Sequence, residues 1–82
     1  MGHTPELRVL LFAALRERAG WRERRLAATP GATPAAVWGQ LGLEPADPAA
    51  SIRVAINQRF ARWDSPLAGG DELAFLPPIS GG

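Results

Sequence analysis

One clear helix start divides this chain into two parts, and each part has the residue alternation of β-strands. In the segment TPAAVWGQLGL, the hydroxyl of Thr33 can accept hydrogen bonds from free backbone N–H groups, and Pro34 suits the first helical position. Gly42 is a suitable end for this helix. Its predicted apolar stripe consists of Ala36, Val37, Leu41 and Leu43. A single main helix flanked by strands has to pack across one face of the sheet that those strands form.

Five segments around the helix are predicted to be strands. They are residues 7–12, residues 21–26, residues 52–56, a strand from Arg59, and residues 72–76. The segment AALRERAG, between the first two, is predicted to be a short helical turn or loop that ends at Gly20. The charged residues of WRERRL indicate an exposed edge strand. Asn57-Gln58 is predicted to be a tight hairpin turn, since Asn tolerates the positive φ that such turns require.

The order strand, strand, helix, strand, strand, strand predicts an α+β fold of the β-grasp (ubiquitin-like) type. Its mixed sheet would have four to five strands, with the one main helix packed across one face. We assign residues 7–76 to this domain, residues 1–6 to a flexible N-terminus and residues 77–82 to an extended C-terminal Gly-Gly tail. The sequence contains no internal repeat and no sign of a second domain.

The residue types that are missing exclude several kinds of chemistry. The 82-residue chain has no cysteine and a single histidine, His3, so we expect neither a disulfide nor a metal site. All nine basic residues are arginine, so there is no lysine or cysteine nucleophile. The net charge of +1 gives no argument for a nucleic-acid partner. Because we find no apolar run of membrane-spanning length and no signal-peptide pattern, we expect a cytoplasmic protein without a membrane partner.

The first and last predicted strands have apolar residues on both faces. The face expected to pack against the helix carries Leu7, Val9, Leu11, Leu73 and Phe75. The opposite face carries Leu10, Phe12, Ala74 and Leu76. With one helix to cover one face, the second apolar set is left open. An open apolar face on so small a domain usually marks a site for a partner.

The C-terminal sequence PPISGG is suited to presenting a reactive carboxyl group. Pro77 and Pro78 fix φ and project the tail away from the sheet, whereas Gly81 and Gly82 lack a Cβ and can pass through a narrow channel. Residues 79–82 span about 13 Å when extended. A terminal carboxylate has a pKa of about 3.3–3.7 and is a poor electrophile at neutral pH. A partner would therefore have to activate it, for instance as an acyl-adenylate made from ATP.

Three segments of the chain resemble the small subunits of molybdopterin synthase, the MoaD-type sulfur carriers of the ubiquitin-like family. The segments are VLLFAALRERAG, VAINQRF and PLAGGDELAFLPPISGG, and the similarity extends from about Leu7 to Gly82. The last segment is the most specific. It combines a glycine-acid turn, an apolar strand, Pro-Pro, the spacer Ile79-Ser80 and a terminal Gly-Gly.

This resemblance implies a role in molybdenum cofactor biosynthesis. A ubiquitin-activating-enzyme-like partner would adenylate Gly82 with ATP, and a persulfide donor would supply the sulfur of a thiocarboxylate. The chain would then bind the large synthase subunit, in a heterotetramer of two small and two large subunits. There its sulfur would pass to a pterin precursor to form the dithiolene that holds molybdenum or tungsten. By this resemblance the chain binds no cofactor and is not catalytic alone, but donates sulfur as one subunit of a sulfurtransferase.

The resemblance also implies which residues contact the large subunit. Phe12, Phe60 and Leu76 match the apolar patch that lies beside the tail in that family. Arg16 matches a family arginine near the interface and could pair with a carboxylate of the partner. The alternative is that Phe12 and Phe60 pack on each other or under a loop of the same chain.

The residues leave three other functions open. A sulfur carrier for thiazole synthesis would share the fold, the activation chemistry and the Gly-Gly ending, although such carriers tend to be shorter and to lack the Pro-Pro. A ubiquitin-like modifier would become attached to lysines of target proteins, but this chain has no lysine and could not form isopeptide-linked chains on itself. The third is an interaction module whose C-terminus has no reactive role.

Overall fold

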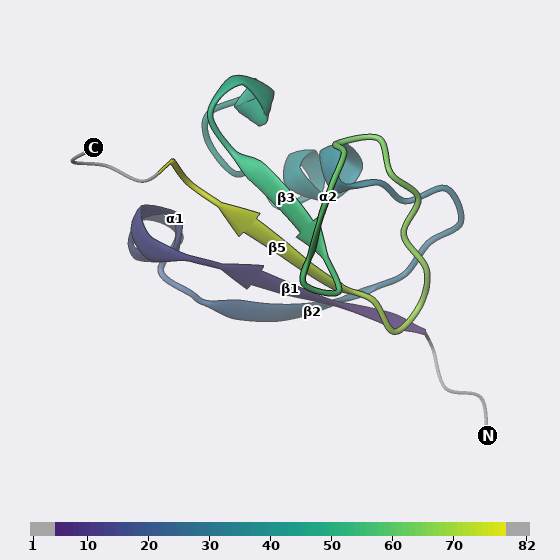
Figure 1. The fold of residues 1–82 in the computed structure, drawn as a ribbon. Helices are drawn as coiled ribbons and strands as arrows, with labels where there is room; N and C mark the ends of the chain where they lie inside the picture. Colours follow the sequence, from purple (N-terminus) through teal and green to yellow (C-terminus); the bar gives the residue numbers. More distant parts are fainter. Residues whose placement is uncertain (1–4, 79–82) are drawn as a thin grey trace.

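The structure is a computed structural model that describes residues 5–78, and its five strands form one mixed sheet (Figure 1). In chain order the strands are β1 (Glu6–Leu11), β2 (Glu23–Ala27), β3 (Arg53–Ile56), β4 (Arg59–Ala61) and β5 (Glu72–Leu76). They lie side by side in the order β2-β1-β5-β3-β4. The central strand β5 runs parallel to β1 and antiparallel to β3, and the two outer pairs are antiparallel. This arrangement confirms the predicted β-grasp fold.

Two helices of seven residues each accompany the sheet, where the sequence predicted one main helix. α1 (Ala13–Ala19) follows β1, whereas α2 (Pro34–Gln40) lies across the far side of the sheet in the view of Figure 1. α1 forms because Ala, Leu, Arg and Glu all have high helix propensity. Gly20 ends it with φ 84° and donates its N–H to the Arg16 carbonyl at 2.9 Å. Two helical turns are too short for periodicity to distinguish a helix from a loop. A 3₁₀ turn, Pro48–Ala50, precedes β3.

α2 begins as predicted, but its buried stripe differs from the prediction. Thr33 Oγ1 accepts a hydrogen bond from the Ala36 N–H at 3.2 Å, which caps the helix. Ala36 itself is exposed, whereas Val37 and Trp38 are buried. The prediction missed Trp38, whose indole Nε1 needs an acceptor when it is buried. That acceptor is the carbonyl of Pro45, 2.8 Å away in the loop after the helix.

The core lies between α2 and the sheet, on the face predicted to pack against the helix. Its most deeply buried side chains from the strands are Leu7, Val9, Val54, Leu73 and Phe75. The rings of Trp38 and Trp63 both pack on Phe75, with ring centroids 4.9 and 5.5 Å from its own. Such aromatic pairs contribute about 0.5–1.5 kcal/mol each beyond the burial of their area. The predicted inner faces of β1 and β5 are therefore confirmed.

The glycine turn before β5 packs against the start of β1. A Cβ at Gly69 would overlap the side chain of Pro5. Gly70 has φ 91° and donates its N–H to the Glu6 carbonyl at 2.8 Å. β1 begins at Glu6, one residue inside the segment that we assigned to the N-terminus, and residues 1–4 lie outside the described part of the chain. The glycine-acid turn thus has a structural reason, which is the close approach of these two backbone segments.

The Asn57-Gln58 hairpin turn is confirmed, and Asn57 also connects this turn to β5. Both residues have positive φ, 52° and 68°, as a type I′ turn requires. The Asn57 side chain accepts a hydrogen bond from the Glu72 N–H and donates one to the Asp71 carboxylate, each at 3.0 Å. The Asn57 backbone N–H donates to the Glu72 carbonyl at 2.8 Å. One residue thus joins the turn to the start of the last strand.

We expect Asn57→Gly to lower the free energy of unfolding by about 1 kcal/mol, because glycine keeps the backbone conformation but loses both side-chain hydrogen bonds. Asn57→Ala should cost about 1 kcal/mol more, since alanine is strained in the left-handed region. Urea denaturation followed by tryptophan fluorescence measures both changes. Equal stability of the two variants would contradict the role that we assign to positive φ.

Candidate functional site

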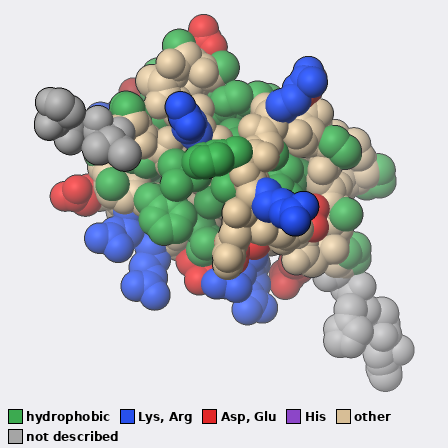
Figure 2. Space-filling view, viewed as in Figure 1, with side chains coloured by type: hydrophobic (Ala, Val, Ile, Leu, Met, Phe, Trp, Pro, Cys, Tyr) green, Lys and Arg blue, Asp and Glu red, His purple; other side chains and the backbone are tan. Residues whose placement is uncertain are grey.

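The face of the sheet opposite α2 carries the candidate functional site. The strand register places Leu10, Ala74, Ala55 and Phe60 in one row across β1, β5, β3 and β4. Figure 2 views the molecule from this side and shows hydrophobic side chains gathered near the centre, with arginines around them. The row therefore passes from a large apolar residue through two small ones to another large one.

The two alanines of this row create a groove. Ala55 and Ala74 are buried at its floor, while Phe12 and Phe60 stand at its sides with 44% and 71% of their surface exposed. The groove has a volume of about 220 Å³ and is lined by Phe12, Ala55, Gln58, Phe60, Glu72, Ala74 and Leu76. Two phenylalanines with this much exposure, on either side of a hollow, are available to a partner.

Three of the four predicted docking residues come together at this groove. Phe12, Phe60 and Leu76 line it, whereas Arg16 is exposed on α1 and is not among the lining residues. The alternative, in which Phe12 and Phe60 are packed away within the chain, does not agree with their exposure. Among residues 5–78, aromatic contacts instead join Trp38, Trp63 and Phe75 in the core.

A second groove continues from the first to the start of the tail. It has a volume of about 590 Å³ and is lined by Ala50, Ser51, Arg53, Phe60, Leu76, Pro77 and Pro78. Phe60 and Leu76 line both grooves, so the two grooves adjoin. We call the residues that line the two grooves the docking surface. The predicted reactive tail, Ile79, Ser80, Gly81 and Gly82, lies outside the described residues.

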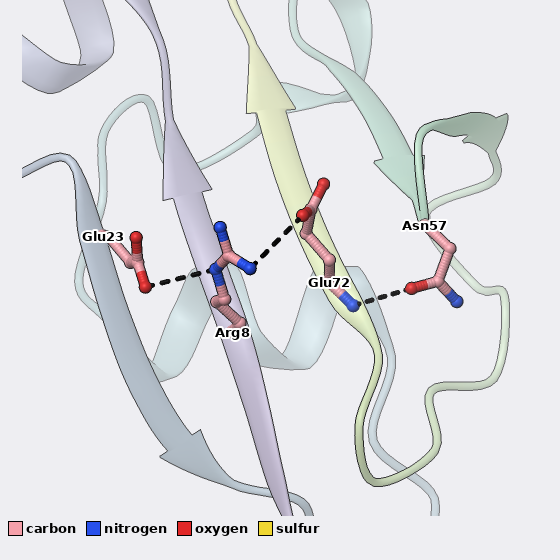
Figure 3. A network of polar contacts seen from close by, with 4 residues as sticks. All are labelled: Arg8, Glu23, Asn57 and Glu72. Atoms are coloured by element: carbon pink, nitrogen blue, oxygen red, sulfur yellow. Dashed lines mark hydrogen bonds and ion pairs between the residues drawn. The ribbon is translucent and has the colours of Figure 1, made fainter.

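Charged side chains gather at the other end of the same face, and one of them, Glu72, also lines the edge of the first groove. Arg8 Nε lies 3.1 Å from the Glu23 carboxylate, and its Nη1 lies 3.8 Å from that of Glu72 (Figure 3). The Glu72 N–H also donates to the Asn57 side chain (Figure 3). Exposed pairs of this kind contribute little to stability. The outer face of the sheet thus has a charged half and an apolar half. The apolar half lies beside the start of the tail, Pro77 and Pro78.

The sequence placed Ala74 on the open face but did not predict the other small or polar residues of the docking surface, which are Ala50, Ser51, Arg53, Ala55, Gln58 and Glu72. A small residue within a strand of large apolar ones, as in VAI and LAFL, is a signal for a hollow in a sheet face. Only the register shows that the two hollows adjoin, because Ala55 lies directly opposite Ala74. The same register places Arg53 opposite Leu76, next to the tail.

Residues 5–78 offer no candidate metal site, since no three His, Asp or Glu side chains among them are grouped so as to hold an ion. His3 lies outside this range. Over the same residues, neither α1 nor α2 has the length or the apolar composition of a membrane-spanning helix.

Curated proteins share sequence with this chain, including one from Arabidopsis thaliana and one from Escherichia coli. The molybdopterin synthase sulfur carrier subunit of Arabidopsis thaliana is 34% identical over 80 residues, which cover 94% of this chain and 83% of that protein. The Escherichia coli protein of the same name is 48% identical over 31 residues, so that the aligned part spans only 38% of each chain.

Comparisons with solved structures and with family profiles identify proteins of the same kind as these relatives. The small archaeal modifier protein 1 of Haloferax volcanii superposes with a TM-score of 0.74 at 31% identity, over 92% of this chain and 99% of that one. The putative molybdopterin converting factor, subunit 1, of Pyrococcus furiosus has a TM-score of 0.73 at 26% identity, with the same coverage. The profile of the ThiS family matches residues 9–82, which include the docking surface and the tail. The resemblance to MoaD-type proteins is thereby confirmed, and the chain belongs to the ThiS family.

Proposed function

We propose that this chain is the sulfur carrier of molybdopterin synthesis, in which Gly82 receives and delivers the sulfur atom. The observation that carries this proposal is the position of the docking surface, which runs to Pro77 and Pro78 at the start of the tail. A protein bound there would lie beside the tail and could enclose its end. The names of the Arabidopsis and Escherichia coli relatives support this role, and the family match extends to residue 82.

The proposed cycle has three chemical steps. On an adenylating partner, the Gly82 carboxylate attacks the α-phosphorus of ATP, which gives an acyl-adenylate and releases pyrophosphate. A persulfide sulfur then attacks the acyl carbon and displaces AMP, and a thiol reduces the S–S bond to leave a thiocarboxylate. Finally the thiocarboxylate sulfur attacks a carbon of the pterin precursor and displaces an oxygen leaving group there, which forms a carbon–sulfur bond. Water then cleaves the acyl–sulfur bond, so that Gly82 returns to the carboxylate and the sulfur stays on the pterin; two loaded chains supply the two sulfur atoms of one dithiolene.

In these reactions the tail of the chain would carry Gly82 into the partner's active site, and the partner proteins would supply the enclosing pockets. An acyl-adenylate hydrolyses in water, so the partner has to enclose it. Pro77 and Pro78 fix φ at about −65° and give the tail a stiff base. The chain has no cysteine, so no internal thiol can capture the activated carboxyl group.

The docking surface would bind two kinds of partner in turn. The first is a ubiquitin-activating-enzyme-like protein that adenylates Gly82. The second is the large subunit of molybdopterin synthase, in a heterotetramer of two small and two large subunits, where Phe12, Phe60 and Leu76 would become buried. Because the apolar half of the face borders the tail, docking and delivery of the tail occur together.

A second candidate function is covalent modification of other proteins, which the similarity to the small archaeal modifier protein 1 favours. A modifier would join Gly82 to a target lysine through an amide bond. Both functions begin with the same acyl-adenylate, so detection of adenylation does not distinguish them.

The mass of the chain after turnover distinguishes the carrier from the modifier. We would load the chain with sulfur, incubate it with the large subunit and the pterin precursor, and record its mass spectrum. The loaded chain should differ from the free one by a single oxygen-to-sulfur exchange, and it should return to the carboxylate mass as a sulfur-bearing pterin forms. A persistent adduct between Gly82 and a lysine of another protein, without a pterin product, would favour the modifier.

Filling the groove should weaken binding without unfolding the domain. We expect Ala74→Leu to raise the Kd for the large subunit roughly tenfold, since overfilling a packed contact typically costs about 1–3 kcal/mol. Ala27→Leu is the matched control, because Ala27 is exposed and its register partner Glu6 places it on the same face but outside the docking surface. Isothermal titration calorimetry and thermal unfolding measure both variants. Equal Kd values for the two would show that the groove is not used.

A further inference from the structure

Arg53 lies at the point where the tail leaves the sheet. It begins β3 and is directly opposite Leu76, the last residue of β5. Its side chain forms part of the wall of the larger groove, together with those of Phe60, Pro77 and Pro78. A partner protein that binds the tail would therefore contact this guanidinium group.

The guanidinium group of Arg53 lies over the ring of Phe60. The guanidinium carbon lies 5.5 Å from the centroid of the ring, which is within the range of a cation–π contact. Because Phe60 is 71% exposed, the pair is accessible from solvent. A guanidinium carries five N–H donors, and a cation–π contact with a ring uses none of them in a hydrogen bond to a carboxylate. The pair thus presents an apolar ring and a planar set of donors side by side.

The charge of Arg53 has no carboxylate partner among residues 5–78. The ion pairs in this range join Arg8 to Glu23 and Glu72, and Arg62 to Asp64. The docking surface therefore combines an apolar groove with one positive charge that these residues leave uncompensated. A partner that fits it would place an acidic group at this position.

We propose that Arg53 binds a carboxylate of the large synthase subunit and so makes docking of this chain specific, an inference that rests on the proposed function. A carboxylate matches the guanidinium fork with two parallel hydrogen bonds. If the tail enters a partner's channel in extended form, Gly82 lies about 13 Å beyond Pro78, and a phosphate at the reactive end would then lie away from Arg53. Contact with the large subunit excludes water from Arg53 and Phe60 and strengthens the ion pair.

Titration of purified large subunit with variants of the chain tests this role. Arg53→Gln should raise the Kd about tenfold or more. Its Kd should also depend less on ionic strength than that of the wild type, because one fewer ion pair is screened by salt. Arg53→Lys should recover only part of the affinity, since an ammonium group keeps the charge but lacks the planar fork.

Arg62→Gln is the matched control, because Arg62 is an exposed arginine close to β4 that already pairs with Asp64. It should change the Kd less than about twofold. Wild-type affinity of Arg53→Gln would overturn the inference and leave the proposed function intact, whereas failure of the wild type to bind the large subunit would overturn both. A loss of affinity seen only with the adenylating partner would overturn the assignment to the large subunit. Thermal unfolding of each variant checks that the domain is folded.

Discussion

Deletion of Gly82, or addition of one residue after it, should abolish sulfur transfer and leave the domain folded. A change of one residue moves the reacting carbon by about 3.5 Å along the tail. Misplacement of a reacting group by about 1 Å can already cost about 10²-fold in rate. The last strand ends at Leu76, so the core and the sheet contacts of the described residues do not involve the altered position.

The measurement is pterin formation by the reconstituted synthase, with circular dichroism as the test of folding. Ala27→Leu is a suitable control, since Ala27 is exposed and lies outside both the docking surface and the tail, and it should retain the activity of the wild type. A Gly82 deletion with full activity would rule out the sulfur-carrier proposal. Loss of activity together with loss of the folded signal would show instead that the tail supports the fold.

Replacement of Phe60 by alanine should separate binding from stability. If Phe60 is an anchor of the docking surface, Phe60→Ala weakens binding to the large subunit by about 2 kcal/mol or more, or about 30-fold in Kd. Its free energy of unfolding should change by less than about 0.5 kcal/mol, because the side chain is 71% exposed.

Phe75→Ala is the contrasting variant. Phe75 is 0% exposed between Trp38 and Trp63, so its loss should destabilise the domain by about 3–5 kcal/mol.

A double variant extends this test. Because Arg53 lies over Phe60, the effects of Phe60→Ala and Arg53→Gln on binding should not add, and the double variant should lose less affinity than their sum. Calorimetric titrations of the two single variants and the double variant give the coupling directly. If Phe60→Ala unfolds while its folded fraction binds normally, Phe60 is structural and the docking face has been assigned wrongly.

The strands were predictable because their signals are local. Alternation places Leu73 and Phe75 on the core side of β5, and this strand has the predicted bounds, Glu72–Leu76. The positive φ of Asn57 follows from the residue type and the strands on either side. The sequence left residues 13–19 open between a helical turn and a loop, because two turns are too short for periodicity to decide, and the structure shows a helix that ends at the predicted Gly20. The burial of Trp38 was missed; its indole N–H is satisfied by the carbonyl of Pro45 in the loop after α2.

Local sequence patterns were enough to predict the inner and outer faces of β1 and β5, the hairpin turn and the helix start at Thr33, and a contiguous motif showed the similarity to the ThiS family. Each of these depends on neighbouring residues or on a contiguous motif. The tertiary structure alone decided which outer residues meet. Ala55 lies opposite Ala74, and Arg53 lies opposite Leu76, only because β3 pairs with β5 in one particular register. A shift of one residue would turn every side chain of the strand to the other face, and that register depends on the packing of the whole core rather than on any local pattern.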